Sequence, residues 1–150
     1  LDIATRMGAT HTLSPDDGLV EQVRALCDGE LPHMVVEAVG KQASFQLAAA
    51  LLRRNGTLLY FGVPNKEEGR GVMTIDFLRM FSNETRIVTT VGPNPHTDYS
   101  PALQWITEGR IDVRPMLTHT LPFADIQHAF TMAFEETEKH GAVKVVLHFD

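Results

Sequence analysis

Residues 56–64 are the stretch that most constrains the fold of this chain. They read Gly-Thr-Leu-Leu-Tyr-Phe-Gly-Val-Pro, a glycine followed by an apolar run and a Gly-Val-Pro turn. The run has no alternating polar face, which is typical of a strand buried on both sides in a parallel sheet. The sequence therefore predicts a central strand of an α/β domain.

A second apolar run lies upstream, with a predicted helix between the two runs. Met34-Val35-Val36 continues into Glu37-Ala38-Val39-Gly40, and residues 41–54 carry apolar side chains at helical spacing. Strand, helix and strand within about 30 residues form a βαβ unit. Ligands of such sheets bind at the carboxyl ends of the strands, so we expect a site at residues 37–41 and 61–64.

Composition and charge exclude several classes of protein. With 150 residues the chain is long enough for one domain with a core, and its net charge of −6 argues against a nucleic-acid or anionic-membrane surface. No apolar run approaches the roughly 20 residues that span a bilayer. The single cysteine, Cys27, leaves no internal disulfide. That fits a reducing compartment, so we expect a cytoplasmic protein.

Patterning predicts the remaining elements. Gly and Pro residues separate segments with helical or extended character. We expect helices at residues 1–7, at a segment that begins at residue 16 or 17 and ends at residue 28, and at residues 100–109 and 124–139, with a helical turn before residue 83. We expect strands at residues 9–13, 86–92 and 142–149. Residues 65–71 are expected to form an exposed loop and residues 72–77 an extended segment.

These elements resemble the zinc-type medium-chain alcohol dehydrogenases and their polyol and threonine dehydrogenase relatives. The resemblance runs through essentially the whole chain, and several segments carry it in the family's order and spacing. They are Met7-Gly8-Ala9-Thr10, Val36-Glu37-Ala38-Val39-Gly40, residues 56–64, Met116-Leu117-Thr118-His119-Thr120-Leu121-Pro122-Phe123, and Gly141-Ala142-Val143-Lys144-Val145-Val146-Leu147.

The resemblance implies an incomplete Rossmann-type parallel sheet, of which this chain supplies the third to sixth strands. The family's zinc-ligand domain and its G-x-G-x-x-G turn are absent, so the chain is expected to be a C-terminal portion of such an enzyme. Residues 1–109 would form a partial dinucleotide-binding domain, and residues 110–150 would return to the catalytic domain. The strand portion at residues 10–13, without its neighbours, is expected to fray or to move beside residues 34–38.

The family's cofactor positions map onto four groups of residues here. The resemblance places Phe61, Gly62 and Val63 at the nicotinamide carboxamide, Thr90, Val91 and Gly92 at a second nicotinamide-facing strand end, Val39, Gly40 and Lys41 at the adenine end, and Lys144 at the pyrophosphate. Each has a plainer explanation, since the first group makes a tight turn in any α/β domain and the lysines could be solvated surface residues. The strand of residues 86–92 is also expected to pair with its mate in a homodimer.

The sequence contains no motif for a zinc site or for a nucleophilic serine. The seven histidines show no H-x-x-x-H spacing, there is no C-x-x-C, and no serine lies in a G-x-S-x-G setting. We therefore expect neither a zinc site nor a catalytic residue within this chain. Glu37, at the end of a buried strand, is expected to need hydrogen-bond partners and to have a structural role.

The resemblance implies an oxidoreductase that transfers a hydride between an alcohol or polyol and NAD or NADP, with zinc in the missing domain. We expect the chain alone to be inactive. A zinc-free quinone or enoyl reductase of the same superfamily and a non-catalytic scaffold or interaction module remain alternatives. A different Rossmann-like enzyme such as a methyltransferase is a further alternative. Methyltransferase sheets end in an antiparallel strand, so the direction of the strand at residues 86–92 distinguishes the two folds.

Overall fold

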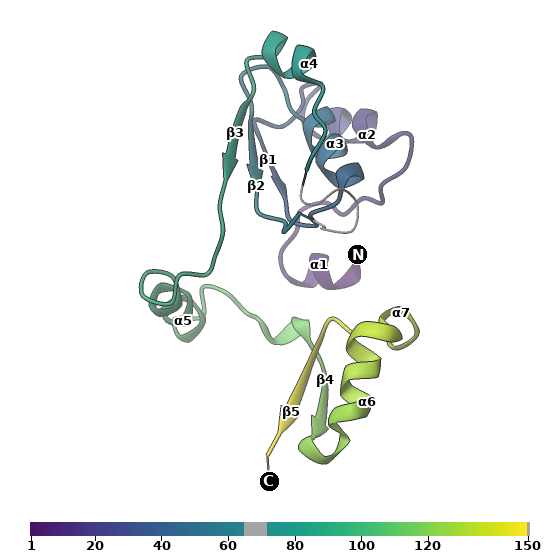
Figure 1. The fold of residues 1–150 in the computed structure, drawn as a ribbon, viewed down its shortest axis with the longest axis vertical. Coiled ribbons are helices and arrows are strands. Elements are labelled where there is room, and N and C mark those ends of the chain that lie inside the picture. Colours follow the sequence, from purple (N-terminus) through teal and green to yellow (C-terminus); the bar gives the residue numbers. More distant parts are fainter. Residues whose placement is uncertain (65–71, 150) are drawn as a thin grey trace. The chain divides into compact units, whose positions relative to one another are not determined.

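The computed structural model describes residues 1–64 and 72–149, so the loop expected at residues 65–71 lies outside the described residues. The chain forms two compact units, Ser14–Pro93 and Leu1–Leu13 with Asn94–Asp150. Their elements are drawn in Figure 1. The expected boundary near residue 109 concerns the domains of a complete enzyme and stays a prediction.

The unit Ser14–Pro93 is built on a parallel sheet. Its strands β1 (Met34–Glu37), β2 (Thr57–Tyr60) and β3 (Arg86–Thr89) pair in that order, with Glu37, Tyr60 and Thr89 in register. The predicted α/β fold with a parallel sheet is confirmed. Because β3 runs parallel to β2, the antiparallel strand that would indicate a methyltransferase is not found at this position.

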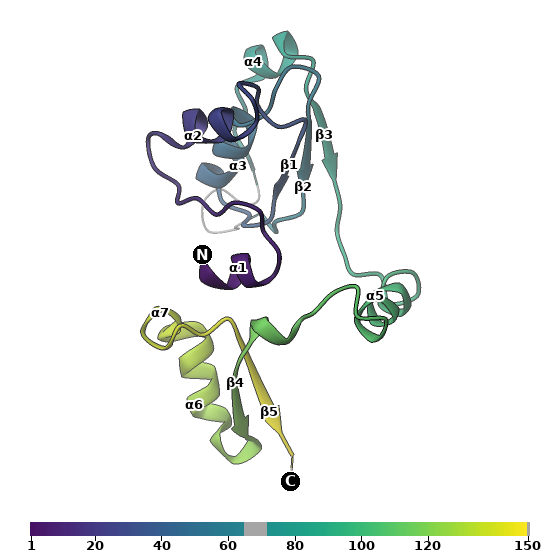
Figure 2. The same cartoon turned by 180° about the vertical axis from the view of Figure 1, so that it is seen from behind.

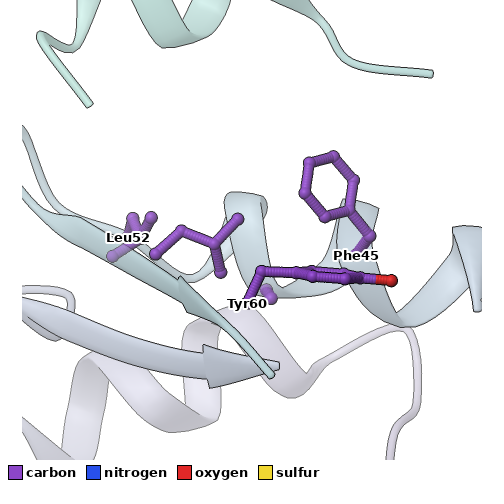
Figure 3. Close-up of a cluster of buried hydrophobic side chains, with 5 residues drawn as sticks. Phe45, Leu52 and Tyr60 are labelled. Carbon is purple, nitrogen blue, oxygen red and sulfur yellow. The ribbon is translucent and has the colours of Figure 1, made fainter. Parts of the chain in front are cut away.

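Helices α2 (Leu19–Leu26) and α3 (Gln42–Ala50) lie on the same side of this sheet, as Figures 1 and 2 show, and α4 (Phe77–Ser82) precedes β3. The apolar spacing within residues 41–54 explains why α3 packs there. Phe45 and Ala48 of α3, with Leu52 just beyond its end, form a buried cluster with Leu58 and Tyr60 of β2, and Figure 3 shows Phe45, Leu52 and Tyr60 in this cluster. The Phe45 and Tyr60 rings meet edge to face at 5.7 Å, a favourable aromatic geometry.

The two faces of the sheet are covered unequally. Along β2, Leu58 and Tyr60 are buried whereas Thr57 and Leu59 are only half-buried. On the same face as Leu59, Val36 is 54% exposed and Val88 46% exposed. The prediction of a central strand buried on both sides is therefore right for one face only, because α2 and α3 both cover that face.

Residues 9–13 form no strand, which corrects the sequence prediction. Nor do they lie in the sheet beside β1, since the only strand that pairs with β1 in the described part of the chain is β2. A strand gains its hydrogen bonds only from a neighbour, so an extended segment without one has no reason to stay regular. The segment therefore has no regular secondary structure in the described chain.

The second unit contains α1 (Asp2–Arg6), α5 (Tyr99–Thr107) and a parallel pair of strands, β4 (Leu117–Pro122) and β5 (Lys144–His148). The helical segment between β4 and β5 lies alongside this pair (Figure 1). The strand predicted at residues 142–149 is thus confirmed as β5. No helix in the described ranges is both long and apolar enough to cross a membrane.

The helix predicted over residues 124–139 is interrupted. It divides into α6 (Ile126–Phe130), a π-helical turn at Thr131–Glu135, and α7 (Thr137–His140). Glu136 lies at the break and accepts hydrogen bonds from Lys139 Nζ and His140 Nε2, which lower the pKa of its carboxyl group. Gly141 ends α7 at φ 60°, as the sequence predicted from its glycine.

Replacing Leu58 with alanine tests the packing of α3 on β2. Leu58 has no exposed surface, so we expect L58A to lower the free energy of unfolding by about 2–5 kcal/mol through lost contacts and a residual cavity. The matched control is L78A in α4, where the side chain is 75% exposed and the expected change is below about 0.5 kcal/mol. Urea unfolding followed by circular dichroism measures both, and equal losses in the two variants would contradict the described core.

Candidate functional site

Backbone hydrogen bonds link the carboxyl ends of β1 and β2. The N–H groups of Phe61 and Gly62 both donate to the carbonyl oxygen of Glu37, at 2.8 and 3.0 Å. Gly40 has φ 85°, and a Cβ placed on it would collide with the Val63 carbonyl group. Two of the predicted groups, residues 39–41 and 61–63, therefore lie together at one edge of the sheet, which we call the strand-end ledge.

A buried carboxylate supports the strand-end ledge. Glu37 is only 3% exposed, and its Oε1 accepts hydrogen bonds from the N–H groups of Val39 and Gly40, both at 2.9 Å. The Ser44 hydroxyl lies 2.6 Å from the same oxygen. The expectation that Glu37 needs partners is confirmed. Ser44 was missed by sequence reasoning, although a serine in the first turn of a helix is a recognisable capping signal.

A cavity of about 360 Å³ lies at the carboxyl ends of β2 and β3. It brings the predicted residues Phe61, Gly62 and Val63 together with Thr90 and Val91. Pro64 also lies in its lining, within the range 61–64 where a site was expected, whereas sequence reasoning missed Tyr60 and Thr89, which directly flank the predicted residues. The complete lining is Tyr60, Phe61, Gly62, Val63, Pro64, Thr89, Thr90 and Val91. Gly92, also predicted, is exposed and does not belong to this lining.

The walls of this cavity are mainly apolar. Phe61 and Val63 are exposed at the end of β2, and Val91 is exposed beyond β3. The backbone of Thr90 is tied to the sheet through its N–H, which donates to the Tyr60 carbonyl oxygen at 3.1 Å. Such a site can hold a flat ring against backbone and apolar side chains, and no Asp, Glu, His, Cys, Lys or Arg is among the described residues that line it.

Tyr60 contributes its ring to the core and no charge to the site. Its side chain packs against Phe45, and its hydroxyl has no hydrogen-bond partner among the described residues. Burial raises the pKa of the Tyr60 phenol, and the nearby Glu37 charge raises it further. The phenol therefore stays neutral at physiological pH.

The two predicted lysines have different settings. Lys41 is exposed at the start of α3, and its N–H donates to Ser44 Oγ at 3.2 Å. Lys144 begins β5 in the other compact unit, where it is exposed and lines a groove with Phe130 and Phe134. Only Lys41 is therefore part of the strand-end ledge, and the role of Lys144 stays a prediction.

Within residues 1–64 and 72–149, no group of three His, Cys, Asp or Glu side chains could hold a metal ion. A nicotinamide ring, by contrast, suits the residues present. Gly40 and Gly62 are buried and let the ends of β1 and β2 pack closely where any Cβ would clash, and the adjoining cavity presents apolar walls beside backbone groups.

Residues 1–108 match the family described as zinc-binding dehydrogenase. The chain belongs to this family. The sequence is 27% identical to sorbitol dehydrogenase from Gallus gallus over 154 aligned positions, covering 100% of this chain and 40% of the relative. The prediction of membership in the zinc-type dehydrogenases is thus confirmed.

Solved structures of this kind share the fold. The apo form of zinc-dependent alcohol dehydrogenase 2 from Streptococcus pneumonia superposes with a TM-score of 0.82 at 22% identity, covering 99% of this chain and 41% of that one. An alcohol dehydrogenase from E. coli CFT073, solved with NADH, gives a TM-score of 0.79 at 19% identity and covers 99% and 41%. The chain therefore spans about 40% of the length of the relatives it matches.

Replacing Gly62 with alanine tests the close approach of the two strand ends. A Cβ there would lie 2.5 Å from Glu37 Oε2 and 2.8 Å from Gly40 Cα, so the ledge must distort. We expect G62A to lower the free energy of unfolding by about 1–3 kcal/mol, the usual cost of overpacking. The control is G18A, whose Cβ would meet only the Gln22 and Asp16 side chains at 3.3 and 3.4 Å. A G62A midpoint in urea equal to that of G18A would contradict this geometry.

Proposed function

We propose that this chain forms the nicotinamide wall and part of the adenine pocket of an NAD- or NADP-dependent alcohol or polyol dehydrogenase. The observation that carries the proposal is the apolar cavity at the ends of β2 and β3, beside the glycine-lined strand-end ledge. Family membership, the sorbitol dehydrogenase relative and the NADH complex of a structural neighbour support it.

The nicotinamide ring, when bound, supplies the hydride acceptor or donor for the reaction. In the proposal, backbone groups of residues 61–63 orient the ring's carboxamide, since a strand end offers donors and acceptors at fixed spacing. Phe61, Val63 and Val91 exclude water from the ring. Thr90 and Gly92 complete the second strand end beside it.

The remaining cofactor contacts follow from the family resemblance. Val39, Gly40 and Lys41 would lie at the adenine end, and the Lys144 ammonium would balance the pyrophosphate charge. Residues 1–109 would belong to the cofactor domain and residues 110–150 to the catalytic domain. The zinc that polarises the substrate oxygen would be bound by residues outside this chain, so we expect no turnover by the chain alone.

We also propose a homodimer through β3. The strand β3 is at the edge of its sheet, and all of its residues are exposed. An open edge of this kind presents unpaired N–H and C=O groups that a second strand can complete. The equivalent strand of a second copy has the same length and the same open edge.

Titration of the ¹⁵N-labelled chain tests the cofactor proposal. We expect NAD⁺ and nicotinamide mononucleotide to shift the amide resonances of residues 61–63 and 89–91, and AMP to shift mainly those of residues 39–41. NADH absorbance in the presence of sorbitol should stay constant, because the chain lacks a metal site in its described part. Absence of any shift with NAD⁺ would contradict the proposal and favour a scaffold role.

A further inference from the structure

Glu37 is the only charged side chain that is buried in residues 1–64 and 72–149. Burying a carboxylate is costly unless hydrogen bonds compensate it, and a buried charge rarely adds net stability over an apolar residue of similar size. Stability of the sheet alone is therefore a poor explanation for this side chain. The direction of its hydrogen bonds gives a better one.

Every described hydrogen bond of the Glu37 carboxylate goes to the segment that leads from β1 into α3. Oε1 accepts from Val39 and Gly40, Oε2 accepts from Gly40 at 3.2 Å, and the Ser44 hydroxyl adds a third donor. Ser44 Oγ in turn accepts from the Lys41 N–H. The carboxylate thus fixes the backbone of the three residues predicted at the adenine end of the cofactor.

The same carboxylate lies against the end of β2. A Cβ on Gly62 would lie 2.5 Å from Oε2, and Gly40 packs on the backbone of Val63. A shift of the segment around Gly40 would therefore move Val63 and alter the cavity beside β3. Through this contact, one side chain sets the relative position of both halves of the strand-end ledge.

We infer that Glu37 is a positioning residue for the nicotinamide cofactor, acting with Ser44 through the strand-end ledge without touching the cofactor itself. The inference rests on the proposed function, because it assumes that the ledge binds the cofactor. The carboxylate holds residues 39–41 and 61–63 in the conformation that accepts the cofactor. Without it, the ledge samples other conformations and the affinity falls.

Substitutions of Glu37 and Ser44 separate this role from support of the fold. E37Q keeps the shape but removes the charge and one acceptor, so we expect the amides of Val39 and Gly40 to exchange with solvent about tenfold faster. The amides of Phe61 and Gly62 donate to the Glu37 backbone carbonyl, which the substitution leaves in place, so their exchange should not change. Exchange of the full chain, followed by NMR, measures all four.

Titration with NAD⁺ measures the effect on the cofactor. We expect E37Q to weaken NAD⁺ binding about tenfold, and S44A to weaken it by a smaller factor of about three. S44T retains the hydroxyl and should bind as the wild type does. E84Q, which alters an exposed carboxylate paired with Arg54 at 3.0 Å, is the matched control and should also bind unchanged.

The outcomes distinguish the two proposals. If Val39 and Gly40 keep their protection in E37Q, the inference is overturned whatever the titration shows. If protection is lost while E37Q and wild type bind NAD⁺ equally, the positioning role is wrong and the proposed function stands. If the wild-type chain binds no NAD⁺, the proposed function fails, and the positioning role fails with it. Should E37Q not fold, the comparison of S44A with S44T decides the same question.

Discussion

The packing of α3 against β2 is the interaction on which the unit Ser14–Pro93 depends. Phe45, Ala48 and Leu52 bury against Leu58 and Tyr60, and this contact anchors the crossover between β1 and β2. Because this crossover connects β1 to β2 in the same direction, the carboxyl ends of the two parallel strands lie at the same end of the sheet. The position of the strand-end ledge therefore follows from a small apolar core at some distance from the site.

The strand-end ledge itself is built from backbone, and its chemistry reflects that. Two glycines let the ends of β1 and β2 approach more closely than side chains would permit, and a buried carboxylate satisfies the amides that the turn leaves free. In the proposed function, this surface would orient a flat ligand, and the reactive groups would be supplied by residues outside this chain.

The sequence predicted the fold where local pattern and packing agree. The parallel strands, α3 and its glycine-bearing end turns were predicted because apolar spacing and Gly or Pro residues mark them directly. The strand at residues 9–13 and the uninterrupted helix at 124–139 were wrong. A strand exists only if a neighbour pairs with it, and the π-helical turn at Thr131–Glu135 changes hydrogen bonding without changing the apolar spacing that the prediction used.

Part of the candidate site was predictable as well. Val39, Gly40, Phe61, Gly62 and Val63 could be identified from their places at strand ends, and the family resemblance added Thr90 and Val91. Residue order by itself thus determined the class of fold and the strand ends at which the candidate site lies, because side-chain periodicity and backbone freedom are local properties. Only the tertiary structure showed that the Glu37 carbonyl oxygen joins the two strand ends, that the Glu37 carboxylate bonds to Ser44 and to the turn before α3, and that Gly92 lies outside the cavity lining, because these depend on the folded arrangement of the backbone and not on a local pattern.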